Sequence, residues 1–433
     1  MVEEKKVPKR ILLSLLNSVS AGVVPRTGAP YIAIGRTKEV GALCVNLETV
    51  AEGGSFSKFI IGKYGSGKSF LISLIRGYAN EKNFVTCDCD LSPERRLSST
   101  QGGGLFTYRE LIKNMSTKTQ DTNAISQILS KWLSDLQMDA SKNGLEKGTD
   151  DFTSYVKSKI YETLKNIESG IGSFDFSFVI SMYYDAYLKD DELKKGYCIK
   201  WLRGEYRTKL ECRSELGLNG IIDDDNWYDY IKLIARFVKE IGYSGLVIFI
   251  DECVNLYKIS NRISRENNYE KILSIYNDTM QGKAAYLGVI FAGTPQFLED
   301  PRRGLFSYEA LKSRLIDTTL PFGQDTVSPL NPLIRLTRLT DDELLALIMR
   351  ITNLYIQAYG NVDVTNEDMK KYLYCILDRA GSSLITPREI TRSYITALSE
   401  VQTGKKMSEL IEMITPNVKT KDPDELDLTD IEI

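Results

Sequence analysis

The chain has 433 residues, 42% of them hydrophobic, and its 55 basic and 58 acidic side chains give a formal net charge of −3. This length exceeds what one hydrophobic core usually organises, so we expect two or three folded units. The even charge balance gives no overall attraction to nucleic acid, although it does not exclude a local basic patch. Because the sequence contains no histidine, histidine-based catalysis and histidine-ligated zinc are excluded.

The seven cysteines are scattered, and no CxxC pair occurs. Free thiols of this kind are typical of a reducing compartment, so we expect a cytoplasmic protein. Cys87 and Cys89 could bind a metal with two distant cysteines, but their place in an apolar strand favours packing as small apolar side chains. No apolar run reaches the ~18 residues that a membrane-spanning helix needs.

The first elements along the chain are a helix over residues 8–22 and a helical pattern over residues 40–50. We assign residues 1–29 to an N-terminal helix and linker. A short apolar strand at Ser57–Ile61 follows, and another is expected at Phe84–Cys89 before a turn that begins at Asp90.

A glycine-rich octet follows the first strand and matches the pattern G-x-x-x-x-G-K-[ST]. Its residues are Gly62, Lys63, Tyr64, Gly65, Ser66, Gly67, Lys68 and Ser69. A helix from Phe70 leaves the octet, so backbone N–H groups and the helix N-terminus can cradle phosphates. The pattern predicts an ATP site in which Lys68 reaches the β and γ phosphates, Ser69 binds Mg²⁺ and Phe70 completes the nucleotide contact.

Residues 105–240 are mostly helical in pattern and far exceed the ~60 residues that two βαβ units require. We therefore expect a helical insertion that offers a partner or substrate surface. Aromatic and cationic residues lie side by side at Trp201–Gly204 and at Tyr206–Arg207. Nucleic-acid contact is one interpretation of these pairs, and a helical face that packs a few aromatics is the favoured one.

Five consecutive apolar residues, Leu246–Ile250, predict a central parallel strand, and two acids follow it directly. Asp251 is expected to hold Mg²⁺ through water. Glu252 is placed to orient and polarise the attacking water, which favours hydrolysis over phosphoryl transfer to a metabolite. A strand ending in acids is common, so the octet upstream makes this interpretation specific.

The next apolar strand, Tyr286–Ala292, ends in Gly293 and Thr294. Two roles stay open for Thr294: a polar contact beside the γ-phosphate, or a cap on the following turn. A helix predicted over Tyr308–Arg314 would place Arg314 where an arginine finger enters a neighbouring subunit. A surface ion pair is the alternative for Arg314, and Arg302 and Arg303 could take the finger role instead.

A last strand at Leu333–Leu336 and three helices, over residues 340–358, 366–379 and 387–400, predict a lid over residues 331–412. Arg388 lies at the start of the third helix and could contact the nucleotide or only solvent. After residue 405 we expect only an acidic tail, residues 413–433, without room for a winged-helix domain.

The order of these motifs resembles AAA+ ATPases of the origin-recognition branch and, more specifically, the BREX-system ATP-binding proteins called BrxD. The first resemblance lies in Tyr31–Arg36 with Glu39, the glycine octet, Leu246–Glu252 and Gly293–Pro295. The second lies in Gly22–Pro25, Trp201–Gly204, Gly245–Glu252 with Asn255–Leu256, Arg303–Leu305, Tyr308 and Ala310–Leu311. It covers residues 10–400 and implies a prokaryotic anti-phage defence component that works beside a helicase.

The sequence as a whole predicts an α/β P-loop core of the AAA+ type over residues 30–330, with a helical insertion and a C-terminal helical lid. The resemblance places Gly35 and Arg36 beside the adenine. We expect ATP hydrolysis with Mg²⁺, coupled to assembly or remodelling of a defence complex. We also expect a homo-oligomer whose partners are a helicase or other defence proteins, and the sequence leaves open whether it binds DNA. A slow ATP-dependent switch that binds a partner and a DNA motor are the alternatives.

Overall fold

The computed structural model describes residues 7–167, 172–316, 327–380 and 385–414. The chain forms two compact units. The larger unit comprises Arg36–Arg338, and the smaller one comprises Met1–Gly35 together with Leu339–Ile433. The predicted tail from residue 415 onward lies outside the described residues.

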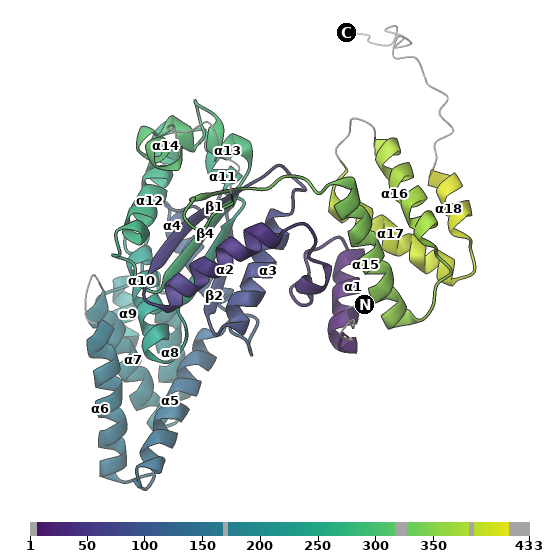
Figure 1. Cartoon of the computed structure of the whole chain (residues 1–433). Coiled ribbons are helices and arrows are strands. Elements are labelled where there is room, and N and C mark those ends of the chain that lie inside the picture. The colour runs from purple at the N-terminus through teal and green to yellow at the C-terminus, as the bar shows by residue number, and fades with distance from the viewer. Residues whose placement is uncertain (1–6, 168–171, 317–326, 381–384, 415–433) are drawn as a thin grey trace, which may run out of the picture. The chain divides into compact units, whose positions relative to one another are not determined.

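A parallel five-stranded sheet with the strand order β2-β3-β4-β1-β5 organises the larger unit (Figure 1). The strands are β1 Ser55–Ile61, β2 Val85–Asp90, β3 Leu246–Asp251, β4 Leu287–Gly293 and β5 Leu333–Arg335. Because neighbouring strands are parallel, their carboxyl ends lie along one edge of the sheet. The predicted α/β fold with a parallel sheet is confirmed.

Helices cover both faces of the sheet, as the continuous apolar strands require. Helices α2 (Thr37–Ala51) and α3 (Lys68–Glu81) pack on the face that carries Ile60, Phe249 and Ile290. The alternate residues of the same strands, among them Phe59, Ile248 and Phe291, point to the opposite core. Helices α4 (Gly103–Lys113), α10 (Trp227–Glu240) and α12 (Arg262–Met280) cover that side.

Several strand residues break this apolar pattern, among them the charged Lys58. Lys58 of β1 is buried, and its Nζ donates to the carbonyl oxygens of Pro329 (2.6 Å) and Asn331. Asn46 of α2 donates to the same Pro329 carbonyl (3.1 Å). Burial lowers the pKa of Lys58 to about 8. The lysine thus satisfies the backbone of the segment that enters β5, in a place where water cannot reach.

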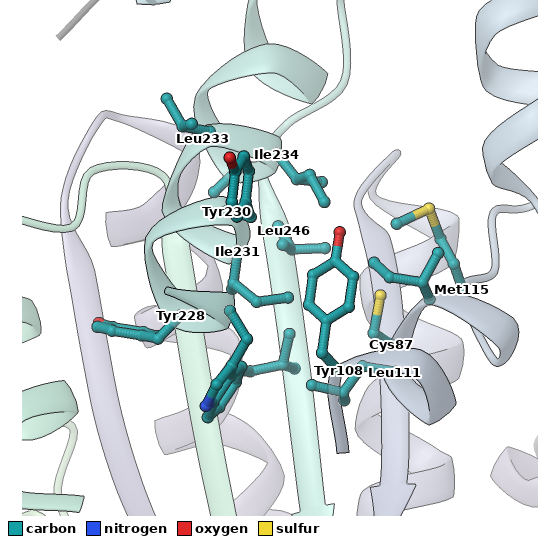
Figure 2. Close-up of a cluster of buried hydrophobic side chains, with 14 of the residues drawn as sticks. Cys87, Tyr108, Leu111, Met115, Tyr228, Tyr230, Ile231, Leu233, Ile234 and Leu246 are labelled. Carbon is teal, nitrogen blue, oxygen red and sulfur yellow. The ribbon is translucent and has the colours of Figure 1, made fainter. Parts of the chain in front are cut away.

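The predicted insertion is a set of helices that shares its core with the sheet. Its members are α4, α5 Ile125–Lys142, α6 Asp150–Ile167, α7 Ser173–Leu188, α8 Glu192–Leu202, α9 Lys209–Leu216 and α10. Figure 2 shows Tyr108 and Leu111 of α4 facing Ile231 of α10, with Cys87 of β2 and Leu246 of β3 beside them. The insertion is therefore continuous with the sheet and has no separate core.

The smaller unit is helical. It contains α1 Lys9–Ser20, η1 Ala29–Ile32, α15 Asp341–Tyr359, α16 Asn366–Ala380, α17 Pro387–Gln402 and α18 Met407–Ile414. The amphipathic helix α1 packs on α15 and α17, so the N-terminal helix and the C-terminal helices build one bundle. Helix α18 buries Met407 and Leu410 against α16 and α17 and ends at Ile414, two residues past the predicted end of the lid at residue 412.

Short elements follow β3 and β4 at the carboxyl side of the sheet. They are α11 Val254–Tyr257, α13 Pro295–Glu299, η2 Leu305–Ser307 and α14 Glu309–Leu315. All seven cysteines are free. In the described part of the chain, no helix is both long and apolar enough to span a membrane.

Candidate functional site

The glycine octet forms the connection between β1 and α3, and its glycines are needed where they stand. Gly65 and Gly67 have φ of +77° and +91°, in the left-handed region that favours glycine. A Cβ on Gly62 would lie 2.3 Å from Ser66 Oγ. The loop backbone therefore closes on itself in a way that side chains at these positions would prevent.

Lys68, the first residue of α3, lies inside this loop. Its Nζ donates to the carbonyl oxygens of Gly62 (2.9 Å) and Lys63 (3.2 Å) and lies 5.5 Å from the ring centre of Tyr64. Desolvation lowers the pKa of Lys68, and the negative charges of Asp251 and Glu252 oppose this shift. The N-terminus of α3 has no side-chain cap, so the positive end of the helix stays directed at the loop.

The acids after β3 meet the loop at Ser69. Its Oγ donates to Asp251 Oδ2 (2.7 Å), and Asp251 is only 7% exposed. Asp251 Oδ1 accepts from the backbone N–H of Glu252 (2.7 Å). Glu252 has φ of +55°, an uncommon conformation for this residue type, of the kind that clusters at functional sites. Its carboxylate faces the hydroxyl of Tyr64 at 3.5 Å and raises the pKa of that tyrosine.

Asp90 lies at the end of β2 and is a third acid at this edge of the sheet. In the sequence it was predicted only to begin a turn. It pairs in register with Asp251 on the neighbouring parallel strand. Desolvation and, second, the Asp251 charge raise the pKa of Asp90 to about 6. The sequence does show that two strands each end in Asp. It does not show that these strands pair in parallel, and the role of Asp90 depends on that pairing.

Arg36 reaches the loop from the start of α2. Its buried guanidinium donates from Nη2 to the carbonyls of Ser66 (2.9 Å) and Thr337 (2.8 Å), and Nη1 lies 3.3 Å from Glu39 Oε1. The structure therefore places Arg36 against the loop backbone. Gly35, the residue before it, belongs to the smaller unit, where a Cβ would lie 2.4 Å from Glu343 Oε1.

The end of β4 lies next to the loop, because the Gly293 carbonyl accepts from the N–H of Gly62 (3.1 Å). Thr294 follows directly and is buried. Its Oγ1 accepts from the N–H of Phe297 (3.4 Å) and caps α13. Phe70 lies half-buried in the first turn of α3.

The candidate arginines have other neighbours. Arg314 of α14 donates from Nε to Asn277 Oδ1 (3.0 Å) and from Nη1 to the Ala310 carbonyl (2.6 Å). Arg303 donates to the Ile259 carbonyl (3.1 Å), whereas the exposed Arg302 is held through its backbone N–H by Asp300 (2.8 Å). Arg388 is exposed at the start of α17 in the smaller unit.

The two aromatic residues of the insertion that lie beside cations in the sequence, Trp201 and Tyr206, pack in its core. Trp201 is buried and donates from Nε1 to the Gly220 carbonyl (2.8 Å). Tyr206 is buried too, and its hydroxyl donates to Glu215 (2.7 Å). The interpretation of these rings as a nucleic-acid stacking surface is therefore wrong, because neither ring presents a face to solvent.

The buried Cys87 and Cys89 are packed as the strand prediction proposed, and burial raises the pKa of both thiols. Over the described ranges, no three histidine, cysteine or acidic side chains converge closely enough to hold a metal ion by themselves. A hydroxyl and a carboxylate, as at Ser69 and Asp251, are nevertheless oxygen donors of the kind that Mg²⁺ takes together with water and phosphate.

These features define the protein class as a parallel α/β protein with a P-loop-like core. Residues 7–413 match the family described as BREX system ATP-binding protein BrxC/D. Because the match spans nearly the whole chain, the protein belongs to this family, and the resemblance seen in the sequence is confirmed. The family description names ATP as the ligand and a BREX system as the setting. No curated protein matches the chain.

Proposed function

We propose that the protein binds ATP with Mg²⁺ in the loop Gly62–Ser69 and hydrolyses it. The hydrogen bond between Ser69 and Asp251 carries this proposal. It brings the end of β3 to the first turn of α3, beside Lys68, and so collects a cation, a hydroxyl and a carboxylate at one end of the sheet. Such sheets bind ligands at the carboxyl ends of their strands.

Lys68 binds the β and γ phosphates in this proposal. Its ammonium group now donates to two loop carbonyls. Phosphate oxygens are charged acceptors and form stronger hydrogen bonds than neutral carbonyls, so the ammonium group would turn to them when ATP enters. The backbone N–H groups of the loop and the uncapped start of α3 supply the remaining positive potential.

Ser69 and Asp251 would hold Mg²⁺, Ser69 directly and Asp251 through water. Mg²⁺ held by these residues would supply positive charge against the β and γ phosphates. Glu252 would accept a hydrogen bond from the attacking water and take its proton as the bond from oxygen to the γ-phosphorus forms. The bond between the γ-phosphorus and the bridging oxygen breaks in the same step, which releases ADP and phosphate. Glu252 has a left-handed backbone and its carboxylate accepts from Tyr64, whereas the carboxylate of Asp251 accepts from Ser69, and these different partners support separate roles for the two acids.

Thr294 and Arg388 are proposed as further nucleotide contacts, and Arg314 as the arginine finger of a neighbouring subunit in an AAA+ homo-oligomer. Gly35 and Arg36 remain proposed neighbours of the adenine, and the guanidinium of Arg36 would in addition support the loop through Ser66. The cellular role we propose is assembly or remodelling of a DNA-associated complex in a BREX anti-phage system. The BREX family match supports that setting, and the large helical insertion offers surface for a helicase or another partner.

Phosphate release from ATP, measured with Mg²⁺ and with EDTA and beside calorimetric ATP binding, tests this proposal. We expect ATP binding and steady turnover that both require Mg²⁺, and a larger mass in solution with ATP than without. Binding without turnover, even with DNA or a partner helicase added, would contradict hydrolysis and favour the slow switch. Absence of binding would contradict the proposal entirely.

A further inference from the structure

The carboxyl end of β2 adjoins the proposed Mg²⁺ site. In the parallel pair of β2 and β3, Asp90 lies opposite Asp251, and residues opposite one another point to the same face of a sheet. That face is the one covered by α3. Asp88, two residues earlier on β2, bonds Arg76 of α3 (2.8 Å), just as Asp251 accepts from Ser69 of α3. Asp90 therefore lies on the same face of the sheet as the Ser69–Asp251 pair.

The three aspartates on this face differ in what their carboxylates contact. Asp88 is committed to Arg76, and Asp251 accepts from Ser69 and from the N–H of Glu252. Asp90 is exposed as a residue, and its carboxylate has no hydrogen bond or ion pair among residues that the structure describes, although the charge of Arg95 acts on it. Its main-chain carbonyl accepts from Arg95 Nε (2.9 Å) and from Cys89 Sγ (3.6 Å). Asp90 thus contributes a free carboxylate to this edge of the sheet.

The charges of Asp251 and Asp88 disfavour an ionised carboxylate at Asp90, and Arg95 only partly offsets them. Direct coordination by all three does not fit, because no three acidic side chains in the described ranges converge on one metal position. Mg²⁺, however, keeps several water molecules when it binds to protein, and neighbouring acceptors orient these waters. An exposed carboxylate one strand away from Asp251 is suitably placed for that task.

We propose that Asp90 is a positioning residue of the Mg²⁺ site and accepts a hydrogen bond from water bound to the ion that Ser69 and Asp251 hold. The inference rests on the proposed ATP·Mg²⁺ function and deepens it. It assigns β2 a part in the site, whereas the sequence motifs assign only the loop and β3. It also explains why β2 ends in an acid at the same level as β3.

The test is calorimetric titration of the full-length protein with ATP at a series of free Mg²⁺ concentrations. Asp90→Asn should raise the Mg²⁺ concentration for half-maximal ATP binding about tenfold, since loss of an outer partner typically costs 10- to 100-fold in metal affinity. Binding and turnover at saturating Mg²⁺ should match the wild type. The control Glu94→Gln removes one negative charge from an exposed position four residues later and should leave the Mg²⁺ dependence unchanged.

An unchanged Mg²⁺ midpoint in Asp90→Asn would overturn the inference. An equal shift in Glu94→Gln would also overturn it, because the effect would then come from general charge. A loss of turnover in Asp90→Asn that saturating Mg²⁺ does not restore would assign Asp90 to water activation instead. Wild-type protein whose ATP binding is independent of Mg²⁺ would contradict the proposed function itself, a result distinct from the three above.

Discussion

Lysines lie over tyrosine rings at several places in the described chain, and the contact in the loop contrasts with one in the insertion. In the loop, Lys68 lies 5.5 Å from the centre of the Tyr64 ring, and Tyr64 is 66% exposed. In the insertion, Lys200 lies 4.4 Å from the Tyr206 ring, and Tyr206 is only 2% exposed. The local composition is alike, but the loop pair borders solvent and the insertion pair is part of a core.

The partners of the two lysines explain the difference. Lys200 bonds two carboxylates, Glu211 (2.6 Å) and Glu215 (2.9 Å), so its charge is fully matched inside the insertion. Lys68 forms no ion pair within the described chain and donates only to neutral carbonyls. A charge matched by its own protein stabilises structure, whereas a charge left with neutral partners at the end of a sheet can still bind a charged ligand.

The largest effect on turnover is expected at Glu252, the acid next to the loop that is proposed to activate water. Glu252→Gln preserves shape but loses the negative charge that polarises water, so turnover should fall by up to about 10⁴-fold. Affinity for ATP·Mg²⁺ should stay close to that of the wild type. Phosphate release and calorimetry on the same preparation measure both quantities, and undiminished turnover would assign the catalytic role to another residue.

A smaller loss, about 10³-fold in turnover, is expected for Arg314→Ala if the residue acts as an arginine finger. Nucleotide affinity should hardly change, because a finger stabilises charge that develops in the transition state. Mixing this variant with a Lys68→Ala variant should restore part of the activity, since some interfaces would then join an intact loop to an intact finger.

For Arg314, a protein that is monomeric at every concentration and fully active as Arg314→Ala would contradict both the finger and the oligomer. The hydrogen bonds of Arg314 to Asn277 and Ala310 would then be its whole role. Arg302 and Arg303 would be the next residues to replace.

A moderate effect is expected at Arg36. Arg36→Ala removes the donors to the Ser66 and Thr337 carbonyls, which loosens the loop backbone and should raise the dissociation constant for ATP about tenfold. The exposed neighbour Lys38 is the matched control, because Lys38→Ala changes charge equally without touching the loop. Equal effects in the two variants would show that net charge, and not loop support, determines affinity.

The smallest effect on nucleotide binding is expected in the insertion. Trp201→Ala should lower the free energy of unfolding by about 3–5 kcal/mol, because a buried indole is replaced by a cavity. ATP affinity of the folded variant should be unchanged. Thermal unfolding measures the stability of the variant, and calorimetry measures its ATP affinity. Weakened ATP binding in a fully folded Trp201→Ala protein would contradict the purely structural role of the insertion core.

The loop and the central strands were predictable because their signals are local. A glycine octet between an apolar strand and a helix specifies its own conformation, and Leu246–Ile250 is apolar without interruption. Helix α12 was not predicted, because its buried face contains Arg265, Asn268 and Thr279 and so lacks a regular apolar stripe.

The remaining features depend on contacts between distant segments. The support of the loop by Arg36 needs the Thr337 carbonyl, which is 301 residues away along the chain. Asp90 joins the site only through the pairing of β2 with β3, which a single sequence does not reveal. The packing of α1 with α15 and α17 likewise joins the two ends of the chain and has no local signature.

The central claim is that the loop binds ATP through Lys68, and two lysines of the same loop allow a matched test. Lys63 is exposed, and its side chain forms no hydrogen bond or ion pair within the described residues, whereas Lys68 is directed into the loop. Calorimetric titration with ATP·Mg²⁺ should show a loss of affinity of at least about 100-fold for Lys68→Ala, because bonds to a charged group are worth roughly 1.5–3 kcal/mol each. Lys63→Ala should bind within a few-fold of the wild type, and Lys68→Ala binding as tightly as Lys63→Ala would contradict the account.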